Sequence, residues 1–170
     1  MKNLVHLWSL ICEKVLVDAE TNNISIIHSI DRFTVNISAE EMKKMQAAGS
    51  SGFSLPIPYN VVTVYRKTTD SEVSFSHRIS LHNPKGSSIA SATNESKIEK
   101  HLKTFRVKNQ MKNLLVDESG VYSIRVEVKE MGEKKYSLCH EIPFEVQINY
   151  IDSGAETESL KTKVSKRKAK

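Results

Sequence analysis

The chain has 170 residues, 39% of them hydrophobic and 26% charged, and a net charge of +5. These values are typical of one globular domain and exclude a fibrous protein or a small scaffold held together by disulfides. Residues 152–170 contain three acids and six bases, so they carry +3 of the net charge and residues 1–151 carry +2. We therefore expect a folded domain over residues 1–151 and a basic, disordered tail over residues 152–170.

An apolar run begins at Leu4, and a turn-forming stretch at residues 18–23 separates it from a second apolar run at residues 24–35. Both runs are rich in β-branched residues, and the asparagines between them tolerate positive φ, so we expect two antiparallel strands. The apolar part of the first run ends at Cys12, and Glu13 follows at once, which is untypical of a secretory signal or a membrane span. We therefore expect a cytoplasmic protein with no membrane partner.

A short helix is predicted at residues 38–49. Ser38 followed by Glu41 has the spacing of a capping box, and Gly49 can end the helix. The next stretch, up to residue 60, is predicted to be a loop, because its two prolines forbid a regular central strand.

Two more strands are predicted at residues 59–68 and 72–82, joined by a short turn. In the second strand apolar residues stand at every second position from Val73 to Leu81, which indicates one buried face. His77 lies on that apolar face, between Phe75 and Ile79 in the alternation.

Residues 96–112 fit two structures. Ile98, Leu102 and Phe105 have helical spacing, whereas every second residue from Phe105 to Met111 fits one face of a strand. We favour the strand, because the surrounding pattern is all-β, and the helix remains the alternative.

The last two strands are predicted at residues 120–130 and 141–150. Each alternates apolar and polar residues, which indicates an antiparallel hairpin with one buried face. Pro143 cannot donate a hydrogen bond to a neighbouring strand, so we expect the last strand to be an edge strand or to begin with a bulge. About seven strands and one short helix together predict an all-β fold, an antiparallel immunoglobulin-like β-sandwich.

The sequence from Glu118 to Ile124, ESGVYSI, resembles the acid-Ser-Gly-x-Tyr-x-Cys corner of immunoglobulin-type domains. Ile124 stands where those domains have their second core cysteine, and Trp8 lies in the first strand rather than mid-chain. An adhesive role is therefore not implied. We predict that Tyr122 is buried and that its hydroxyl group bonds to nearby backbone.

A broader resemblance covers residues 5–150. The segments LICEKVLVD, ISIIHSIDRFTV, VVTVYRK, LLVDESGVYSIRVEV and EIPFEV occur in the order seen in a family of small bacterial proteins that is defined by a domain of unknown function. That family has proline where this chain has Ser119. The resemblance implies a bacterial origin and a sandwich fold, and it implies no functional residue.

The sequence contains no spacing typical of a metal or cofactor site, such as Cys-x-x-Cys or His-x-x-x-His. On a strand His77 and His82 point to opposite faces, and so do the neighbours Cys139 and His140. No Gly-x-Ser-x-Gly sequence is present, and the acidic residues 117–118 fit a turn. We therefore predict no catalytic residue, no metal, no cofactor and no enzyme. An enzyme whose site is assembled from dispersed residues remains the alternative.

Cys12 and Cys139 are too few and too far apart for a secreted disulfide framework. We predict two reduced, buried thiols. A disulfide between them, if they face each other in the sandwich, remains the alternative.

The final ten residues carry six positive charges and no aromatic residue. Such a segment can neutralise phosphates without reading bases, so nonspecific nucleic-acid binding or an acidic partner is one interpretation and a solubilising tail is the other. In the stretch 97–108, Lys100 and Arg106 would share one strand face and Lys103 the other, so no basic stripe is predicted. The six candidate residues are Lys161, Lys163, Lys166, Arg167, Lys168 and Lys170.

These observations lead to the hypothesis of a non-catalytic binding or scaffolding module. A protein partner, or a second copy of the chain, would pair with an exposed sheet edge, for which residues 141–150 are the candidate. Nucleic-acid binding through the tail is an alternative function. The sequence does not identify the partner.

Overall fold

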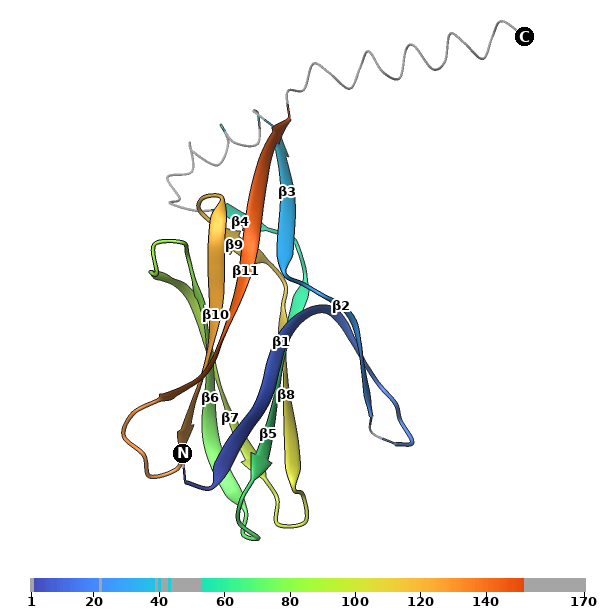
Figure 1. The fold of residues 1–170 in the computed structure, drawn as a ribbon, viewed down its shortest axis with the longest axis vertical. Helices are drawn as coiled ribbons and strands as arrows, with labels where there is room; N and C mark the ends of the chain where they lie inside the picture. The colour runs from blue at the N-terminus through green and yellow to red at the C-terminus, as the bar shows by residue number, and fades with distance from the viewer. Residues whose placement is uncertain (1, 22, 39, 41–42, 44–52, 152–170) are drawn as a thin grey trace, which may run out of the picture.

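The structure is a computed structural model that describes residues 2–21, 23–38, 40, 43 and 53–151 (Figure 1). The described residues form eleven strands in three sheets. In spatial order, the four-stranded sheet contains β2 (Ile24–Ser29), β1 (Leu4–Val17), β5 (Tyr59–Lys67) and β8 (Thr104–Met111). The five-stranded sheet contains β3 (Arg32–Ser38), β11 (Ser137–Ile151), β10 (Gly120–Glu130), β6 (Val73–His82) and β7 (Ser88–Ile98). The short strands β4 (Phe53–Leu55) and β9 (Leu114–Val116) pair with each other.

The main core lies between the two larger sheets. Ile11 and Val61 of the four-stranded sheet share one buried cluster with Ile79, Ile124 and Val146 of the five-stranded sheet. The predicted alternation produces this core, because side chains at every second position point to the same face of a strand. The apolar positions predicted on β6 and β10 are all buried, as the sequence indicates.

The β1–β2 hairpin covers part of the outer face of the four-stranded sheet. β1 pairs with β5 up to Cys12 and with β2 from Cys12 onward, so its second half leaves the sheet (Figure 1). On that outer face Cys12, Val15 and Val62 form a separate buried cluster, against which Trp8 and Ile24 pack. The hairpin therefore has an apolar underside of its own.

Eleven strands replace the seven that the sequence predicts. The predicted run at residues 24–35 divides at Ile30 and Asp31 into β2 and β3, because Ile30 donates its N–H to Ile11 and Asp31 accepts from Glu145. The predicted loop before residue 60 contains the three-residue β4, and its two prolines lie between β4 and β5. β7, β9 and the division of the second run were not predicted, since their apolar patterns are short or weak.

The region of residues 96–112 is strand and loop. It contains the end of β7, a loop at residues 99–103, and β8. Phe105, Val107, Asn109 and Met111 oppose core-facing residues of β5, so the favoured alternative is confirmed. Most of the predicted helix at residues 38–49, and the whole tail from residue 152, lie outside the described residues.

The prediction that residues 141–150 form an edge strand is wrong for the second half of β11. β3 pairs in parallel with Glu145–Ile151, and β10 pairs with β11 on the other side. The residues of β11 before Glu145 have only β10 as a hydrogen-bonded neighbour. Pro143 lies in this part, where no strand pairs with the other side of β11 and its missing N–H costs no hydrogen bond on that side. The pairing of β10 with β11 changes register between Val126 and Glu127, opposite His140 and Leu138 near the start of β11. The other predicted possibility, a bulge at the beginning of the last strand, therefore agrees with the structure.

Candidate binding surfaces

Tyr122 sits at the corner that leads into β10, and it is fully buried. Its hydroxyl accepts hydrogen bonds from the N–H groups of Asp117 and Glu118 at 2.9 and 3.1 Å. It lies 2.6 Å from a carboxylate oxygen of Asp117 and 2.8 Å from the carbonyl oxygen of Glu118, and it can donate its one hydrogen bond to either. The predicted burial and backbone bonding of Tyr122 are confirmed, and the acids at residues 117–118 belong to the turn.

Asp117 is held in the corner from two sides. Burial acts to raise the pKa of its carboxyl group, but hydrogen bonds from Tyr122 and from the Asn83 amide, at 2.6 and 2.7 Å, outweigh that effect and lower it. Glu118 pairs with Lys85 at 3.1 Å, so both acids of the corner have partners close to the turn.

A polar group of side chains lies inside the core between β1, β5 and β6. His77 is fully buried, its two ring nitrogens have no hydrogen-bond partner, and its ring meets that of Tyr65 edge to face. Burial, with a smaller effect from His6, lowers the pKa of His77 from 6.5 to about 4. The imidazole is therefore neutral at pH 7, and no cluster of three potential metal ligands occurs among the described residues.

The two cysteines do not form a disulfide. Cys12 is buried in the outer cluster under the hairpin, whereas Cys139 is half-buried beside the main core. Burial raises the pKa of the Cys139 thiol to about 11, so it is a poor nucleophile at pH 7. The prediction of reduced thiols is confirmed, with Cys139 less buried than expected.

A groove of about 470 Å³ runs between the β1–β2 hairpin and β8. Val15, Val17 and Ile24 of the hairpin form one wall, and Val62 of β5 lies at its base. The other wall consists of consecutive residues 101–106 together with Lys108. Because residues of both strand faces line this wall, the groove follows the free edge of β8, the last strand of its sheet.

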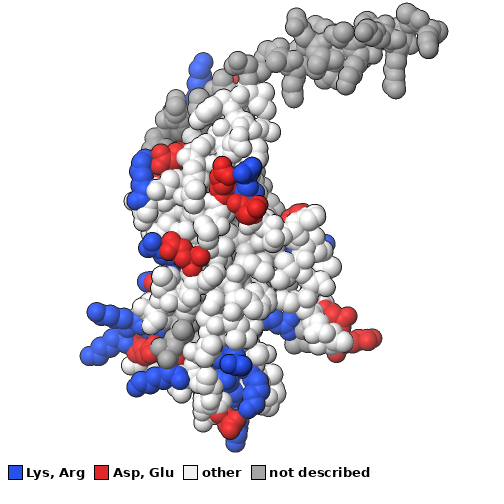
Figure 2. Space-filling view, viewed as in Figure 1, with Lys and Arg blue, Asp and Glu red and all other residues white. Residues whose placement is uncertain are grey.

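The groove is apolar on the hairpin side and cationic on the β8 side. Among the described residues that line it, Lys103, Arg106 and Lys108 are cationic and none is acidic. Lys103 forms an exposed ion pair with Asp70, whereas Lys108 has no ion pair with a described residue. In Figure 2 acidic atoms lie at the tip of the hairpin, at the lower right.

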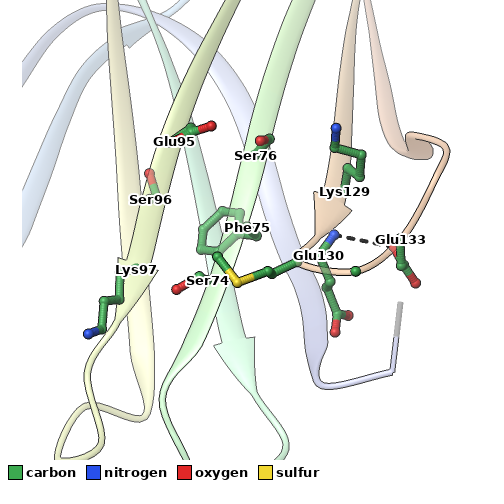
Figure 3. A pocket seen from close by; sticks show the side chains of 11 residues that line it. Ser74, Phe75, Ser76, Glu95, Ser96, Lys97, Lys129, Glu130 and Glu133 are labelled. Atoms are coloured by element: carbon green, nitrogen blue, oxygen red, sulfur yellow. Dashed lines mark hydrogen bonds between the residues drawn. The ribbon is translucent and has the colours of Figure 1, made fainter.

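A second hollow, of about 450 Å³, lies on the outer face of the five-stranded sheet (Figure 3). Ser74 and Ser76 of β6 and Glu95 to Lys97 of β7 form one part, and the end of β10 with the turn after it forms the rest. The turn is fixed by the bond from the N–H of Met131 to the carbonyl of Ser74, 2.9 Å long. The hollow is therefore shaped by main-chain contacts.

The described side chains that line the hollow are of mixed chemical type. Its residues include serines, lysines, glutamates and the partly apolar pair Phe75 and Met131, but neither histidine nor cysteine among those described. The hydroxyl groups of Ser74, Ser76 and Ser96 have no base as a hydrogen-bond partner among the described residues. A serine nucleophile needs such a base.

The tail residues that the sequence singles out lie outside the described residues. The structure instead brings together three bases that sequence reasoning dismissed. The prediction that Lys103 and Arg106 point to opposite faces treated residues 97–108 as one continuous strand. Residues 99–103 form a loop instead, so Lys103 lines the same groove as Arg106 and Lys108. Arg106 and Lys108 are two residues apart on β8, so they lie on the same face of the strand. This spacing was the feature of the sequence that could have predicted part of the cationic wall.

No protein-family model and no curated protein matches the chain. Among solved structures, the chain is similar to a family 123 glycoside hydrolase from Clostridium perfringens, studied for glycolipid glycan hydrolysis. The match has 12% identity and a TM-score of 0.36, and it covers 75% of this chain and 24% of the hydrolase. The chain thus spans about a quarter of that protein, and so low a score indicates neither fold nor activity.

Among the described residues no helix is both long and apolar enough to cross a membrane.

Proposed function

We propose that the protein is a non-catalytic binding module that captures an extended acidic segment of a partner protein along β8. The groove carries this proposal, because it combines a free strand edge, an apolar wall and a cationic wall. An added strand can bond to the free edge while its alternate side chains contact the two walls. The binding edge is therefore β8, in place of residues 141–150.

Charge decides which segment fits. Lys103, Arg106 and Lys108 attract glutamate or aspartate, and no described residue that lines the groove carries a carboxylate. Lys103 already shares an exposed ion pair with Asp70, so Lys108 is expected to contribute most. Val15, Val17 and Ile24 on the facing wall favour apolar residues at the positions between the acids. A segment that alternates acidic and apolar residues meets both conditions.

Lysines on an edge strand have a second known effect, which is to oppose unwanted pairing between sheets. A purely protective edge would bind no strand of either charge. The two roles are therefore separated by offering the groove short peptides of opposite charge.

The test uses a short peptide that alternates valine with glutamate, and its counterpart that alternates valine with lysine. Trp8 is the only tryptophan and packs on the cluster that contains Val15 and Val62, so its fluorescence reports binding. The acidic peptide should bind, more weakly at high salt, and a version interrupted by proline should not. Lys108→Glu should weaken binding about tenfold through charge repulsion.

Lys134→Glu is the matched control, since Lys134 is exposed in the turn between β10 and β11. It makes the same charge change without touching the groove, and binding should be unaltered. Equal binding of the lysine peptide, or equal effects of the two substitutions, would refute the proposal.

A second candidate function rests on the basic tail. The six charges at residues 161–170 support sequence-nonspecific binding of nucleic acid. Deleting these ten residues should abolish retention of DNA at low salt and leave peptide binding in the groove unchanged. Retention that survives the deletion would exclude the tail as its cause.

The fold is proposed to be of the immunoglobulin-like kind. Two facing, mostly antiparallel sheets and the corner at Tyr122 support an elaborated immunoglobulin-like β-sandwich, to which the β1–β2 hairpin and the β4–β9 pair are additions. The likeness to a family of small bacterial proteins remains a prediction from sequence.

A further inference from the structure

The hollow on the five-stranded sheet holds two opposite charges that nothing in the described part of the chain neutralises. Lys129, Ser76 and Glu95 are direct cross-strand neighbours on β10, β6 and β7. Neither Lys129 nor Glu95 forms an ion pair with a described residue. Figure 3 shows the Ser76 side chain between the Glu95 carboxylate and the Lys129 ammonium group along one rim of the hollow.

The other charges in the hollow are already engaged. Lys97 pairs with Glu72 at 2.8 Å. Glu130 is buried and accepts hydrogen bonds from the N–H groups of Lys2 and Asn3, and Glu133 accepts one from the N–H of Glu130. Glu95 and Lys129 have no ionic partner among the described residues. The Lys129 ammonium group lies 5.1 Å from the centre of the Tyr136 ring, a cation-π contact that leaves its charge without a counter-ion.

Two adjacent strand spacings separate the α-carbons of Lys129 and Glu95, which is about 10 Å. Their side chains do not meet, so the space over Ser76 can hold a molecule that is positive at one end and negative at the other. A simple anion would be repelled by Glu95, and a cation by Lys129. The hydroxyls of Ser74 and Ser76, on the same face of β6, supply hydrogen bonds along the way.

We propose that this hollow binds a zwitterion with a free amino and a free carboxylate group, namely a short peptide or an amino acid. The ammonium group lies at Glu95 and the carboxylate at Lys129. The exposed side chain of Met131 gives a side chain of the ligand an apolar contact. A volume of about 450 Å³ is in the range of small-molecule sites. This site is on the opposite sheet from the groove and does not depend on the function proposed there.

The test titrates the full chain with alanyl-phenylalanine and follows amide shifts in the nuclear magnetic resonance spectrum. We expect shifts confined to residues near 74–76, 95–97 and 129–133. The N-acetylated and C-amidated forms of the dipeptide should each bind roughly tenfold more weakly, because each lacks one charge. Equal binding of a blocked form, or no shifts at millimolar dipeptide, would overturn the proposal.

Substitutions in the protein make the same test from the other side. Glu95→Gln and Lys129→Gln should each weaken dipeptide binding roughly tenfold, and Glu72→Gln should not. The double variant Glu95→Lys with Lys129→Glu restores the charge pair in reverse and should recover binding of the unblocked dipeptide. Failure of the double variant while its spectrum remains that of a folded protein would contradict the charge pairing. Lys108→Glu, which alters the groove, should leave this titration unchanged.

Discussion

Tyr122 shows how one hydroxyl group can fix a change of chain direction. The N–H groups of Asp117 and Glu118 both point at this oxygen. Gly120, the first residue of β10, has a φ of 150°. A Cβ at Gly120 would lie 2.8 Å from Cγ of Pro84, so the corner also needs glycine. The corner is therefore specified by a few residues close together in the sequence.

Replacing Tyr122 with phenylalanine should destabilise the protein. The substitution keeps the buried ring but leaves the two N–H groups of residues 117 and 118 without their partner. The Asp117 carboxylate loses one of its two side-chain donors and keeps Asn83. We expect the free energy of unfolding to fall by about 1–3 kcal/mol, measured by urea denaturation. Tyr150→Phe is the control, because Tyr150 is 63% exposed, and it should change little. Equal stabilities of the two variants would mean that the corner bonds contribute nothing.

At the scale of elements, Lys67 at the end of β5 joins two turns at one end of the molecule. Its side chain is buried, and its ammonium group contacts the carbonyls of Asp70, Ser71, Glu99 and Lys100 at 2.7–3.5 Å. These carbonyls belong to the β5–β6 turn and to the loop between β7 and β8. The charge is thus solvated by main-chain oxygens in place of water.

Lys67→Met should loosen both turns together. The variant keeps the apolar stem and removes the donor that four carbonyls share, so we expect a loss of about 3 kcal/mol in the free energy of unfolding. Amide hydrogen exchange should quicken at residues 68–72 and 99–103. Lys103→Met removes only an exposed ion pair with Asp70 and should have an effect near zero. If exchange in the loop before β8 is unchanged, Lys67 does not connect the two turns.

For the whole molecule, the buried His77 makes the fold sensitive to acid. Its pKa is about 4 when folded and about 6.5 when unfolded, so between these values only the unfolded chain binds the proton. Stability is therefore complete above pH 6.5 and falls by about 3 kcal/mol as the pH falls to 4. His6 contributes in the same direction, because burial and His140 lower its pKa too.

The measurement is urea denaturation of wild type and His77→Phe at pH 7 and pH 5. The phenylalanine keeps a ring against Tyr65 and cannot take a proton, so the loss of stability on acidification should be smaller in this variant. His101→Gln is the control, because the His101 side chain is 72% exposed, and its pH dependence should match wild type. An equal loss in wild type and His77→Phe would show that other groups cause the acid sensitivity.

The sequence by itself determined the all-β class, the buried faces of β6 and β10, and the corner at Tyr122. Each depends on residues within a few positions of one another: alternation sets which face of a strand is apolar, and turn residues set where the strand begins. The same alternation placed His77 on the core face. The alternation did not show that both ring nitrogens of His77 would lack a hydrogen-bond partner.

Only the tertiary structure decided which strands are neighbours and which edges stay free. Every residue except proline offers the same backbone donor and acceptor, so apolar alternation does not say which strands pair. It therefore did not predict that β3 pairs in parallel with β11 and covers half of the strand expected to be an edge. The groove joins residues 15–24 with residues 101–108. Lys129, Ser76 and Glu95, the neighbours proposed to hold a zwitterion, lie on three different strands. Such sites depend on the order of strands in the sheets, which contacts between distant segments determine.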